Sequence, residues 1–438
     1  MINYAPLDIN RKTVIMKKLL VAAYTTLVYC TAFSAGFGLY EASPRGNALG
    51  GSLVGKTGDA TANYFNPANL TDLTNVSVVV GTTLINPFCD VKVDSHAQQK
   101  MNPGWFVAPT FYASIPLPWD FALGWGNYSE YGLGTKYGRH WDLAGDTVET
   151  TMKQYTFNPN LAYKVTDWWS VAGGIRMSYI QFENFKEPHH GESFYYSAYG
   201  MTLPQYPNAY HLKSHLKGDD WDFGYNLGTT VKVATNVSLG VVYRSRIRHN
   251  IKGDFNLRGH ANTPLGRVVQ HEDLHAGAKL TLPQSITFGG NWDVTSKFRL
   301  GTAITWTEWS SVETIRFRIP KYGYNENLKW HDAWRFGFGG EYDLTNWLTL
   351  RGGYVYDRDP CNHGTTMLPA GDRHILGLGT GFKITENLRF DLGYNLIAME
   401  NSDRTINLTT MSGAVEKYRF SARNSFSHLV SASISYSF

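Results

Sequence analysis

A two-residue alternation that returns along the chain limits the fold more than any other sequence feature. At the C-terminus one side of the alternation is apolar and ends on an aromatic residue: Val430, Ala432, Ile434, Tyr436 and Phe438. Leu429 and four serines occupy the intervening positions. Two residues is the side-chain period of a β-strand. The same apolar, aromatic-rich face recurs within 171–179, 298–306, 348–356 and 390–396, with glycine and charge on the other face.

Composition favours a membrane barrel over a soluble fold. Aromatic residues make up 14% of the chain and charged residues only 17%, against about 25% charged residues in ordinary globular proteins. Beyond the N-terminus, no segment stays apolar for the roughly 18 residues that a transmembrane helix needs. Because backbone polar groups in lipid must be hydrogen-bonded within the protein, a closed barrel is the alternative to a helix. A soluble sandwich also alternates, but an aromatic face that persists from strand to strand favours the barrel.

The N-terminus predicts export. Residues 1–34 contain Met16-Lys17-Lys18 followed by a largely apolar run, which is typical of a secretory signal peptide. We expect cleavage after Ser34 or after Ala35, and Met16 is the more natural start. Residues 1–34 carry four basic residues and one acidic residue, so about +1 of the total charge of +4 remains after cleavage. That charge does not indicate a nucleic-acid partner.

The spacing of short turns predicts the number of strands. Six tight turns, near 116–120, 166–168, 234–236, 295–297, 344–346 and 385–387, alternate with long polar stretches such as 186–220 and 309–328. This is the pattern of an outer-membrane barrel with short turns in the periplasm and long loops outside. Six hairpins and two terminal strands give an all-β, antiparallel barrel of fourteen strands over residues 75–438. We predict strands at 75–86, 105–116, 120–128, 152–165, 168–181, 221–234, 236–250, 270–294, 297–308, 329–343, 346–357, 373–384, 387–399 and 427–438. Pro283 predicts a bend or bulge in the long eighth strand.

Residues 35–74 do not alternate and are rich in Gly, Ala and Asn. A barrel of fourteen strands is wide enough to need filling, since about eight strands already enclose packed side chains. Apolar residues such as Phe37, Leu39 and Leu49 are unusual in a disordered tail. We therefore predict that 35–74 form a hatch that plugs the lumen, and a periplasmic tail is the alternative.

Several motifs along the mature chain resemble one family. They are Ala35-Gly36-Phe37-Gly38-Leu39-Tyr40-Glu41-Ala42-Ser43, Arg45-Gly46-Asn47-Ala48-Leu49-Gly50-Gly51, Tyr64-Phe65-Asn66-Pro67-Ala68, Asn127-Tyr128 with Tyr131-Gly132-Leu133, Trp306-Thr307-Glu308-Trp309-Ser310-Ser311, and Tyr354-Val355-Tyr356-Asp357 with Asp372-Arg373. The chain resembles the outer-membrane long-chain fatty acid transporter (FadL/TodX) family. The resemblance implies a fourteen-strand barrel with an N-terminal hatch. It implies passive uptake of hydrophobic molecules such as fatty acids or hydrocarbons. The ligand would enter by an extracellular groove, occupy a site near the mature N-terminus and leave sideways through a bend in the third strand.

The resemblance also suggests site residues. Asn66, Pro67 and Ala68 match the family's hatch motif, although the tripeptide alone is an ordinary turn. Phe37 matches a position beside the internal ligand, and packing within the plug is the alternative. The glycines and the amide of the third strand, Gly124, Gly126 and Asn127, are candidates for the bend, since glycine weakens a strand, but glycine is frequent throughout this chain.

A fatty-acid carboxylate needs a cation, for which we name Arg176 and Arg373 as candidates. Arg244, Arg299 and Arg351 are further lumen arginines, and most of these side chains are expected to pair with lumen carboxylates instead. An uncharged hydrocarbon would need no cation. The aromatic stretch 186–220 is a candidate for the extracellular groove, and His189-His190 alone do not define a metal site.

The remaining expectations concern cofactors, thiols, partners and rival functions. We expect no cofactor or metal. We expect a monomer in contact with outer-membrane lipid and lipopolysaccharide. The terminal Phe438 would be part of the signal that the assembly machinery reads when it inserts the barrel. An oxidising compartment permits a Cys89–Cys361 disulfide, and two free thiols are the alternative. A general porin and an outer-membrane lipid-modifying enzyme are the rival functions. The sequence has no Gly-x-Ser-x-Gly elbow, but that motif belongs to another fold.

Overall fold

A computed structural model of the chain describes residues 36–438 apart from ten short gaps. The gaps are 95–97, 102–103, 140, 142, 145, 188–209, 264–265, 321–322, 362–364 and 410–414. The predicted signal peptide, His189-His190 and most of the aromatic stretch 186–220 therefore lie outside the described residues. Among those described, no helix is long and apolar enough to cross a membrane.

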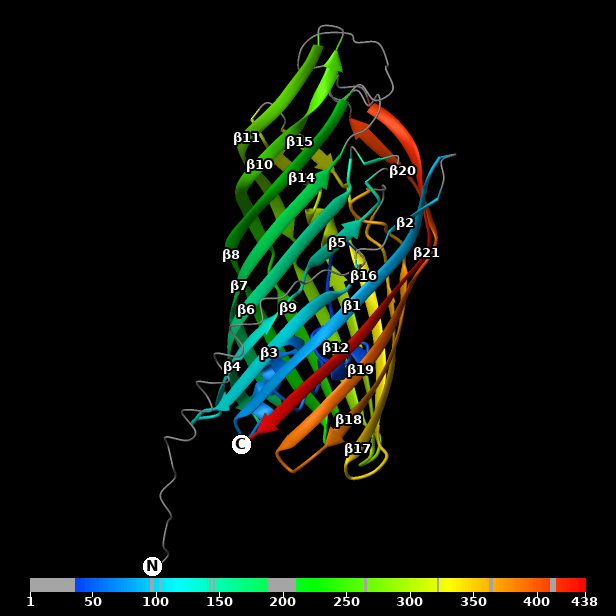
Figure 1. Cartoon of the computed structure of the whole chain (residues 1–438). Helices are drawn as coiled ribbons and strands as arrows, with labels where there is room; N and C mark the ends of the chain where they lie inside the picture. Colours follow the sequence, from blue (N-terminus) through cyan, green and yellow to red (C-terminus); the bar gives the residue numbers. More distant parts are fainter. Residues whose placement is uncertain are drawn as a thin grey trace, which may run out of the picture.

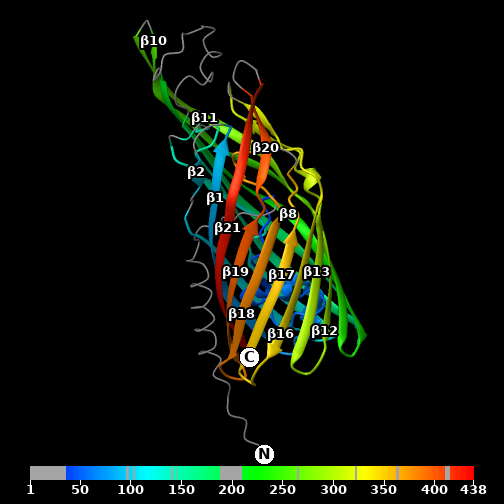
Figure 2. The same ribbon diagram turned by 90° about the vertical axis from the view of Figure 1, so that its right-hand side faces the viewer.

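The described strands form one antiparallel sheet that closes on itself as a tall barrel (Figure 1, Figure 2). The strands are β1 (Ser77–Val93), β2 (Gln99–Met101), β3 (Phe106–Pro116), β4 (Phe121–Tyr128), β5 (Gly132–Lys136), β6 (Glu149–Thr166), β7 (Trp169–Lys186), β8 (Tyr210–Ala234), β9 (Val237–Arg244), β10 (Ile247–Thr263), β11 (Gly266–Leu282), β12 (Ser285–Asp293), β13 (Phe298–Thr307), β14 (Thr314–Arg318), β15 (Tyr324–Asn327), β16 (Ala333–Asp343), β17 (Leu348–Asp357), β18 (Arg373–Lys383), β19 (Leu388–Met399), β20 (Ser402–Thr409) and β21 (Val415–Ser437).

The barrel has the fourteen strand positions that the sequence predicts. The first strand pairs with the last from Ser77↔Ser437 to Val93↔Phe420, which closes the ring. Between them, β4 and β5 share the third position, β9 and β10 the seventh, and β11 and β12 the eighth. Each of these three pairs counts as one position, and β2, β14, β15 and β20 extend their neighbours. The described part of the chain therefore has fourteen strand positions.

The structure confirms the interruption at Pro283, because β11 ends at Leu282 and β12 begins at Ser285. It corrects several boundaries at the extracellular end. Residues 210–220, which we assigned to a loop, belong to β8, and the last strand begins at Val415 instead of 427. The stretch 309–328 holds η3 (Trp309–Ser311), β14 and β15. The strands extend beyond the alternating apolar segments, because ladder hydrogen bonds continue above the membrane where polar side chains can face water.

The outward face carries the apolar alternation. Leu376, Leu378 and Ile434 are 53%, 55% and 54% exposed to the surroundings of the barrel. At the short turns, Trp119, Trp168 and Trp347 are 85%, 55% and 55% exposed. Exposed tryptophans at one rim form the aromatic girdle that is expected at a membrane boundary.

The described part of the predicted hatch, residues 36–74, lies inside the barrel (Figure 1). It folds into α2 (Pro44–Ala48), α3 (Ala62–Phe65) and η1 (Pro67–Asp72), and Ser43 caps α2 by accepting a hydrogen bond from the Gly46 N–H at 3.1 Å. Wall glycines make room for it. A Cβ atom on Gly337 would lie 2.1 Å from the Gly50 carbonyl oxygen, and one on Gly339 would lie 2.4 Å from that of Leu49. The inner glycine face of the strands is thus where the hatch packs.

Candidate functional site

In the periplasmic half of the lumen, a network of ion pairs lies beside the apolar side chains of the hatch. On α2, Arg45 pairs with Glu341 of β16 at 2.7 Å. Arg351 bridges Glu341 at 3.1 Å and Asp391 at 2.7 Å, and Arg299 contacts both Glu341 and Asp343. Arg299 and Arg351 are therefore paired with lumen carboxylates, as the sequence led us to expect of most lumen arginines. Within this network the Arg45–Glu341 pair joins the hatch to the wall, and the other pairs join strands of the wall to one another.

The hatch motif is held by the same kind of polar contact. The Asn66 side chain is fully buried, and its Nδ2 donates to the carbonyl oxygens of Val54 and Thr229 at 2.9 and 3.0 Å and to Thr230 Oγ1 at 2.8 Å. Its Oδ1 accepts from the Ala68 N–H at 3.1 Å, which caps η1, and Pro67 begins that helix. The motif therefore joins two turns of the hatch to β8.

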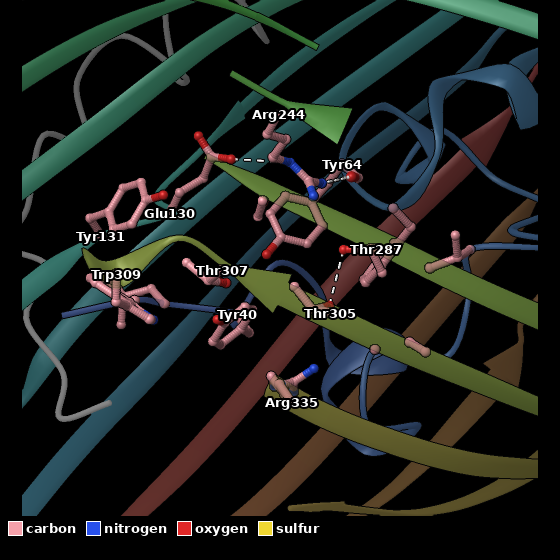
Figure 3. Close-up of a pocket in the computed structure, with 17 residues that line it drawn as sticks. Tyr40, Tyr64, Glu130, Tyr131, Arg244, Thr287, Thr305, Thr307, Trp309 and Arg335 are labelled. Atoms are coloured by element: carbon pink, nitrogen blue, oxygen red, sulfur yellow. Dashed lines mark hydrogen bonds and ion pairs between the residues drawn. The ribbon is translucent and has the colours of Figure 1, made fainter. Parts of the chain in front are cut away.

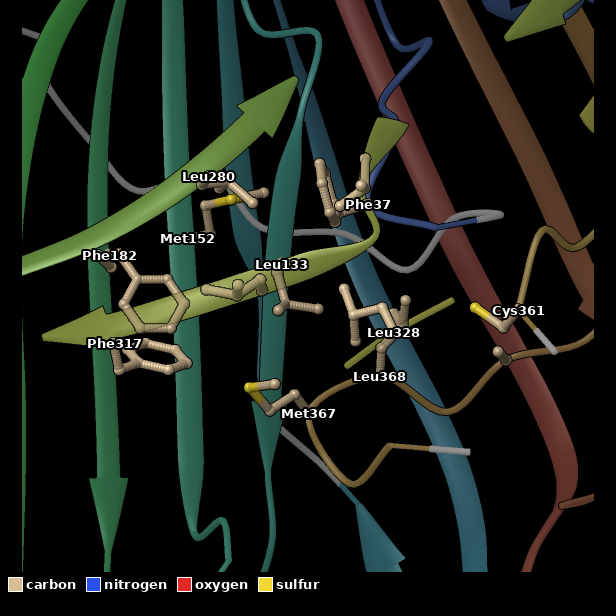
Figure 4. Close-up of a cluster of buried hydrophobic side chains, with 14 of the residues drawn as sticks. Phe37, Leu133, Met152, Phe182, Leu280, Phe317, Leu328, Cys361, Met367 and Leu368 are labelled. Atoms are coloured by element: carbon tan, nitrogen blue, oxygen red, sulfur yellow. The ribbon is translucent and has the colours of Figure 1, made fainter. Parts of the chain in front are cut away.

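A large apolar cluster fills the extracellular half of the lumen, and Phe37 lies at the end of this cluster that faces the hatch. Buried side chains from the barrel strands and the extracellular segments form one continuous cluster there (Figure 4). The Phe37 ring meets the rings of Tyr131, Trp309 and Trp330 at centroid distances of 5.8, 5.0 and 5.4 Å. Phe37 is 4% exposed. The sequence motif contained Trp309, but alternation alone could not show that this residue faces Phe37.

The third strand is interrupted beside this aromatic group. Pairing between β3 and β4 ends at Phe111↔Asn127, and in the described chain β5 pairs with β6 alone. Ser129–Tyr131 turn inward to the hatch instead, where the Leu39 N–H donates to the Glu130 carbonyl at 2.7 Å and the Gly132 N–H donates to that of Phe37 at 2.8 Å. The upper part of β3 is thus left without a strand neighbour on this side, so the wall is discontinuous here.

The residues that we named for the bend lie just before this interruption, and their part in a lateral opening stays a prediction. Gly124, Gly126 and Asn127 lie in regular pairing with β3 and β6. A Cβ atom on Gly124 would lie 2.0 Å from Asn63 Oδ1, and one on Gly126 would lie 3.2 Å from Asn63 Cβ. The two glycines therefore admit a hatch side chain, and the bend follows them at Ser129–Tyr131.

Both arginines that we proposed for a ligand carboxylate are engaged with protein groups. Arg176 is 1% exposed and pairs with Glu130, its Nε lying 3.1 Å from Oε2, and it also donates to the Ser245 carbonyl at 2.8 Å. Arg373 is 1% exposed and pairs with Asp357. Their role as ligand partners stays a prediction. The sequence did not point to Glu130 as a site residue. The residues on either side of it, Asn127-Tyr128 and Tyr131-Gly132-Leu133, match a family motif, but Glu130 is not part of that motif.

A cavity of about 60 Å³ lies between the hatch and the wall next to Glu130 (Figure 3). Arg244 lines it, with Nε 3.2 Å from Glu130 Oε1 and the guanidinium 4.8 Å from the centre of the Tyr64 ring. On the other side the Arg335 guanidinium lies 4.3 Å from the Tyr40 ring. Burial raises the pKa of Tyr40 to about 12, so its phenol lines the cavity as an uncharged group.

Comparison with known proteins identifies the family that has this architecture. The family described as "Outer membrane protein transport protein (OMPP1/FadL/TodX)" matches residues 25–438. The chain belongs to this family. It is 26% identical over 399 residues to the 47 kDa outer membrane protein of Pasteurella multocida, covering 87% of this chain and 92% of that protein. It is 24% identical over 417 residues to the long-chain fatty acid transport protein of Escherichia coli O6:H1, covering 88% and 91%.

Solved structures share the fold. A FadL homologue from Pseudomonas aeruginosa superposes with a TM-score of 0.81 at 19% identity, over 92% of this chain and all of that one. The toluene transporter TodX of P. putida superposes with a TM-score of 0.70 at 18% identity, over 90% and 98% of the two chains. This chain is therefore an outer-membrane β-barrel of a transport family, and the resemblance that the sequence motifs indicated is confirmed.

Proposed function

We propose that this protein carries small hydrophobic molecules passively across the outer membrane. The observation that carries the proposal is the position of the wall interruption. The apolar upper lumen ends at Phe37, and Ser129–Tyr131 leave the wall next to Phe37. An apolar molecule that enters from outside would therefore reach an exit to the side before it meets the ion pairs between the hatch and the wall.

A sideways path is also favoured by what lies below. To continue downward, the molecule would have to separate Arg45, Arg299 and Arg351 from Glu341, Asp343 and Asp391. An apolar molecule offers these charges no hydrogen bonds, and a buried charge that loses its partner is strongly unfavourable. The membrane interior offers the molecule a favourable destination instead.

Movement of the hatch would have to accompany transport. The cavity of about 60 Å³ is smaller than the roughly 150 Å³ apolar cavity that binds benzene. Phe37 fills the lower end of the apolar lumen. We therefore propose that Phe37 moves to admit the ligand and that Asn66, Pro67 and Ala68 control the seating of the hatch.

We propose long-chain fatty acids or hydrocarbons as the cargo. The fatty acid transport proteins of E. coli and the P. putida toluene transporter, to which the chain is similar, represent both classes. A fatty-acid carboxylate would have to compete with Glu130 for Arg176 or with Asp357 for Arg373. An uncharged hydrocarbon would avoid that competition.

The division of the chain and its surroundings belong to the same proposal. Residues 1–34 would be removed on export, 35–74 would act as the hatch, and 75–438 would form the barrel. The protein would work as a monomer in contact with lipopolysaccharide after insertion by the assembly machinery, without a cofactor.

Uptake of radiolabelled oleate and of radiolabelled toluene tests the proposal, in cells that lack their own transporter of this family. Leu133 is 6% exposed in the apolar lumen, so Leu133→Arg would place a charge on the proposed path. A loss of about 1.4 kcal/mol of favourable interaction already lowers uptake about ten-fold, and Leu133→Met is the matched apolar control. Equal uptake of both compounds by the two variants and by cells without the protein would contradict the proposal.

We also propose that the protein is not an enzyme, although one contact invites the question. Ser178 Oγ lies 3.0 Å from His249 Nε2, and His249 Nδ1 lies 3.1 Å from Asp220 Oδ2. Serine hydrolases use this order of groups. Ser178 is fully buried here, however, and Gln154 Nε2 donates to its Oγ at 2.9 Å. A substrate carbonyl could not approach the hydroxyl, so a fluorophosphonate probe is expected not to label folded protein, and labelling at Ser178 would support a lipid-modifying activity.

A further inference from the structure

Three buried asparagine amides form a closed ring in the barrel wall. Asn158 Nδ2 donates to Asn226 Oδ1 at 2.8 Å, Asn226 Nδ2 donates to Asn160 Oδ1 at 2.8 Å, and Asn160 Nδ2 donates to Asn158 Oδ1 at 3.0 Å. Asn158 and Asn160 lie on β6 and Asn226 on β8, and each is at most 3% exposed. Every hydrogen bond of the ring runs in the same direction, so a change at one amide alters what the next can donate or accept.

The ring has one contact to the hatch and one to the third strand. Asn160 Nδ2 donates to Asn63 Oδ1 of α3 at 3.1 Å. The Tyr128 hydroxyl donates to Asn158 Oδ1 at 2.9 Å. Tyr128 is the last residue of β4, immediately before the interruption at Ser129–Tyr131. The ring therefore connects the hatch to the residue at which the wall stops being continuous.

The hatch also holds the far side of the interruption. Gly38 forms an isolated β-bridge with Tyr131, and the Leu39 and Gly132 N–H groups bond across the same pair of segments. The interruption is thus fixed from Asn63 through the ring at its lower end, and from Gly38 at its upper end. Gly124 and Gly126 leave the space that Asn63 needs to reach the ring.

We infer that the asparagine ring and Tyr128 couple the seating of the hatch to the width of the wall interruption. The inference rests on the proposed function only in taking the interruption as the exit. When Asn63 withdraws with the hatch, Asn160 Nδ2 loses one of three acceptors and keeps the carbonyl and side-chain oxygens of Asn158, at 3.2 and 3.0 Å. Its two N–H groups then both depend on Asn158, so the position of the Asn158 amide is no longer set by the hatch. The ring then rearranges, Asn158 no longer holds the Tyr128 hydroxyl, and β4 is free to separate further from the upper part of β3. Asn160, Asn158 and Tyr128 are positioning residues in this mechanism.

Distances between pairs of spin labels test the coupling in the full chain, in detergent. One labelled pair spans the interruption and consists of Val107→Cys on β3 and Lys153→Cys on β6. Lys153 pairs with Gly132 of β5, and in the described chain β5 has no pairing with β3. Ile115→Cys and Leu161→Cys form the control pair, since both are in register with Leu123 of β4 in the continuous wall. The natural Cys89 and Cys361 are 3% and 2% exposed, so labelling favours the introduced thiols.

Asn160→Leu removes the ring and its contact to the hatch, and Tyr128→Phe removes only the hydroxyl contact to Asn158. We expect Asn160→Leu to lengthen the 107–153 distance by up to about 5 Å, one interstrand spacing, and Tyr128→Phe to lengthen it less. The 115–161 distance stays constant in both variants. The matched control is Asn395→Leu on β19. It removes the hydrogen bond of 2.8 Å that Asn395 Nδ2 donates to the Asn47 carbonyl of the hatch, and it should leave the 107–153 distance unchanged.

An unchanged 107–153 distance in both Asn160→Leu and Tyr128→Phe would overturn the inference, as would an equal change in Asn395→Leu. Tyr128→Phe keeps the tyrosine ring packing against Tyr64, at 5.0 Å between centroids, and so guards against a general loss of folding. Uptake separates this inference from the proposed function. If the distance widens but wild-type protein takes up neither oleate nor toluene, the coupling stands and the transport proposal fails.

Discussion

Asn66→Ala should loosen the hatch and leave the barrel intact. The substitution removes the η1 cap, which contributes about 1 kcal/mol. It also removes three donated contacts that share the two amide hydrogens, to Val54 O, Thr229 O and Thr230 Oγ1. Two net hydrogen bonds contribute about 1 kcal/mol each. Because the cap and the Val54 contact lie within the hatch, the loss of about 3 kcal/mol applies relative to a hatch that is both released and unfolded, and the population of that state rises roughly 100-fold.

The barrel should not share this loss, because its stability comes from the closed ladder that β1 and β21 complete. Hydrogen–deuterium exchange measured by mass spectrometry separates the two parts. Amides in residues 54–72 should exchange about 100-fold faster in Asn66→Ala, while strand amides and the heat-modifiable gel mobility stay as in wild type. Asn86→Ala is the matched control, since Asn86 is buried and, among the described residues, donates to the Gly104 carbonyl, away from the hatch. Unchanged exchange in 54–72, or equal acceleration in the strands, would show that the hatch is not a separately released unit.

Four further outcomes are expected. Deleting residues 37–70 should raise single-channel conductance in planar bilayers, because the lumen is then unplugged, and an unchanged conductance would contradict a plugging role for the hatch. N-terminal sequencing of mature protein should begin at Ala35 or Gly36, and a retained residue 1–34 segment would refute the signal peptide. Deleting Phe438 should lower the amount of heat-modifiable barrel in outer-membrane fractions, whereas normal levels would remove its role in assembly. Cys89 and Cys361 are free and buried, and burial raises the pKa of the Cys361 thiol. A maleimide should therefore modify both thiols only after denaturation. Failure to modify them in denatured, unreduced protein would indicate a disulfide.

The sequence alone predicted the barrel and the strand count correctly, because both are written in local patterns. Alternation places apolar side chains such as Ile434 and Leu376 on one face wherever the strand lies in the sheet. Short turns mark the hairpins without reference to distant residues. The motif around Asn66 contacts the wall through Thr229 and Thr230, and its part in gating stays a prediction.

Only the tertiary structure decided the details of the site, because they depend on contacts between residues far apart in the chain. Which carboxylate pairs with Arg176 is set by the inward turn of Ser129–Tyr131, which brings Glu130 past β6 to Arg176 on β7, 46 positions away in sequence. Gly124 and Gly126 show the same dependence, because a glycine in a strand weakens pairing in one context and here admits a neighbour, Asn63. In the sequence, Asn158, Asn160 and Asn226 are ordinary polar residues on the inward-facing side of their strands. They become a ring only when β6 and β8 are brought within hydrogen-bonding reach on either side of β7, which the curvature of the closed barrel achieves and the sequence does not encode locally.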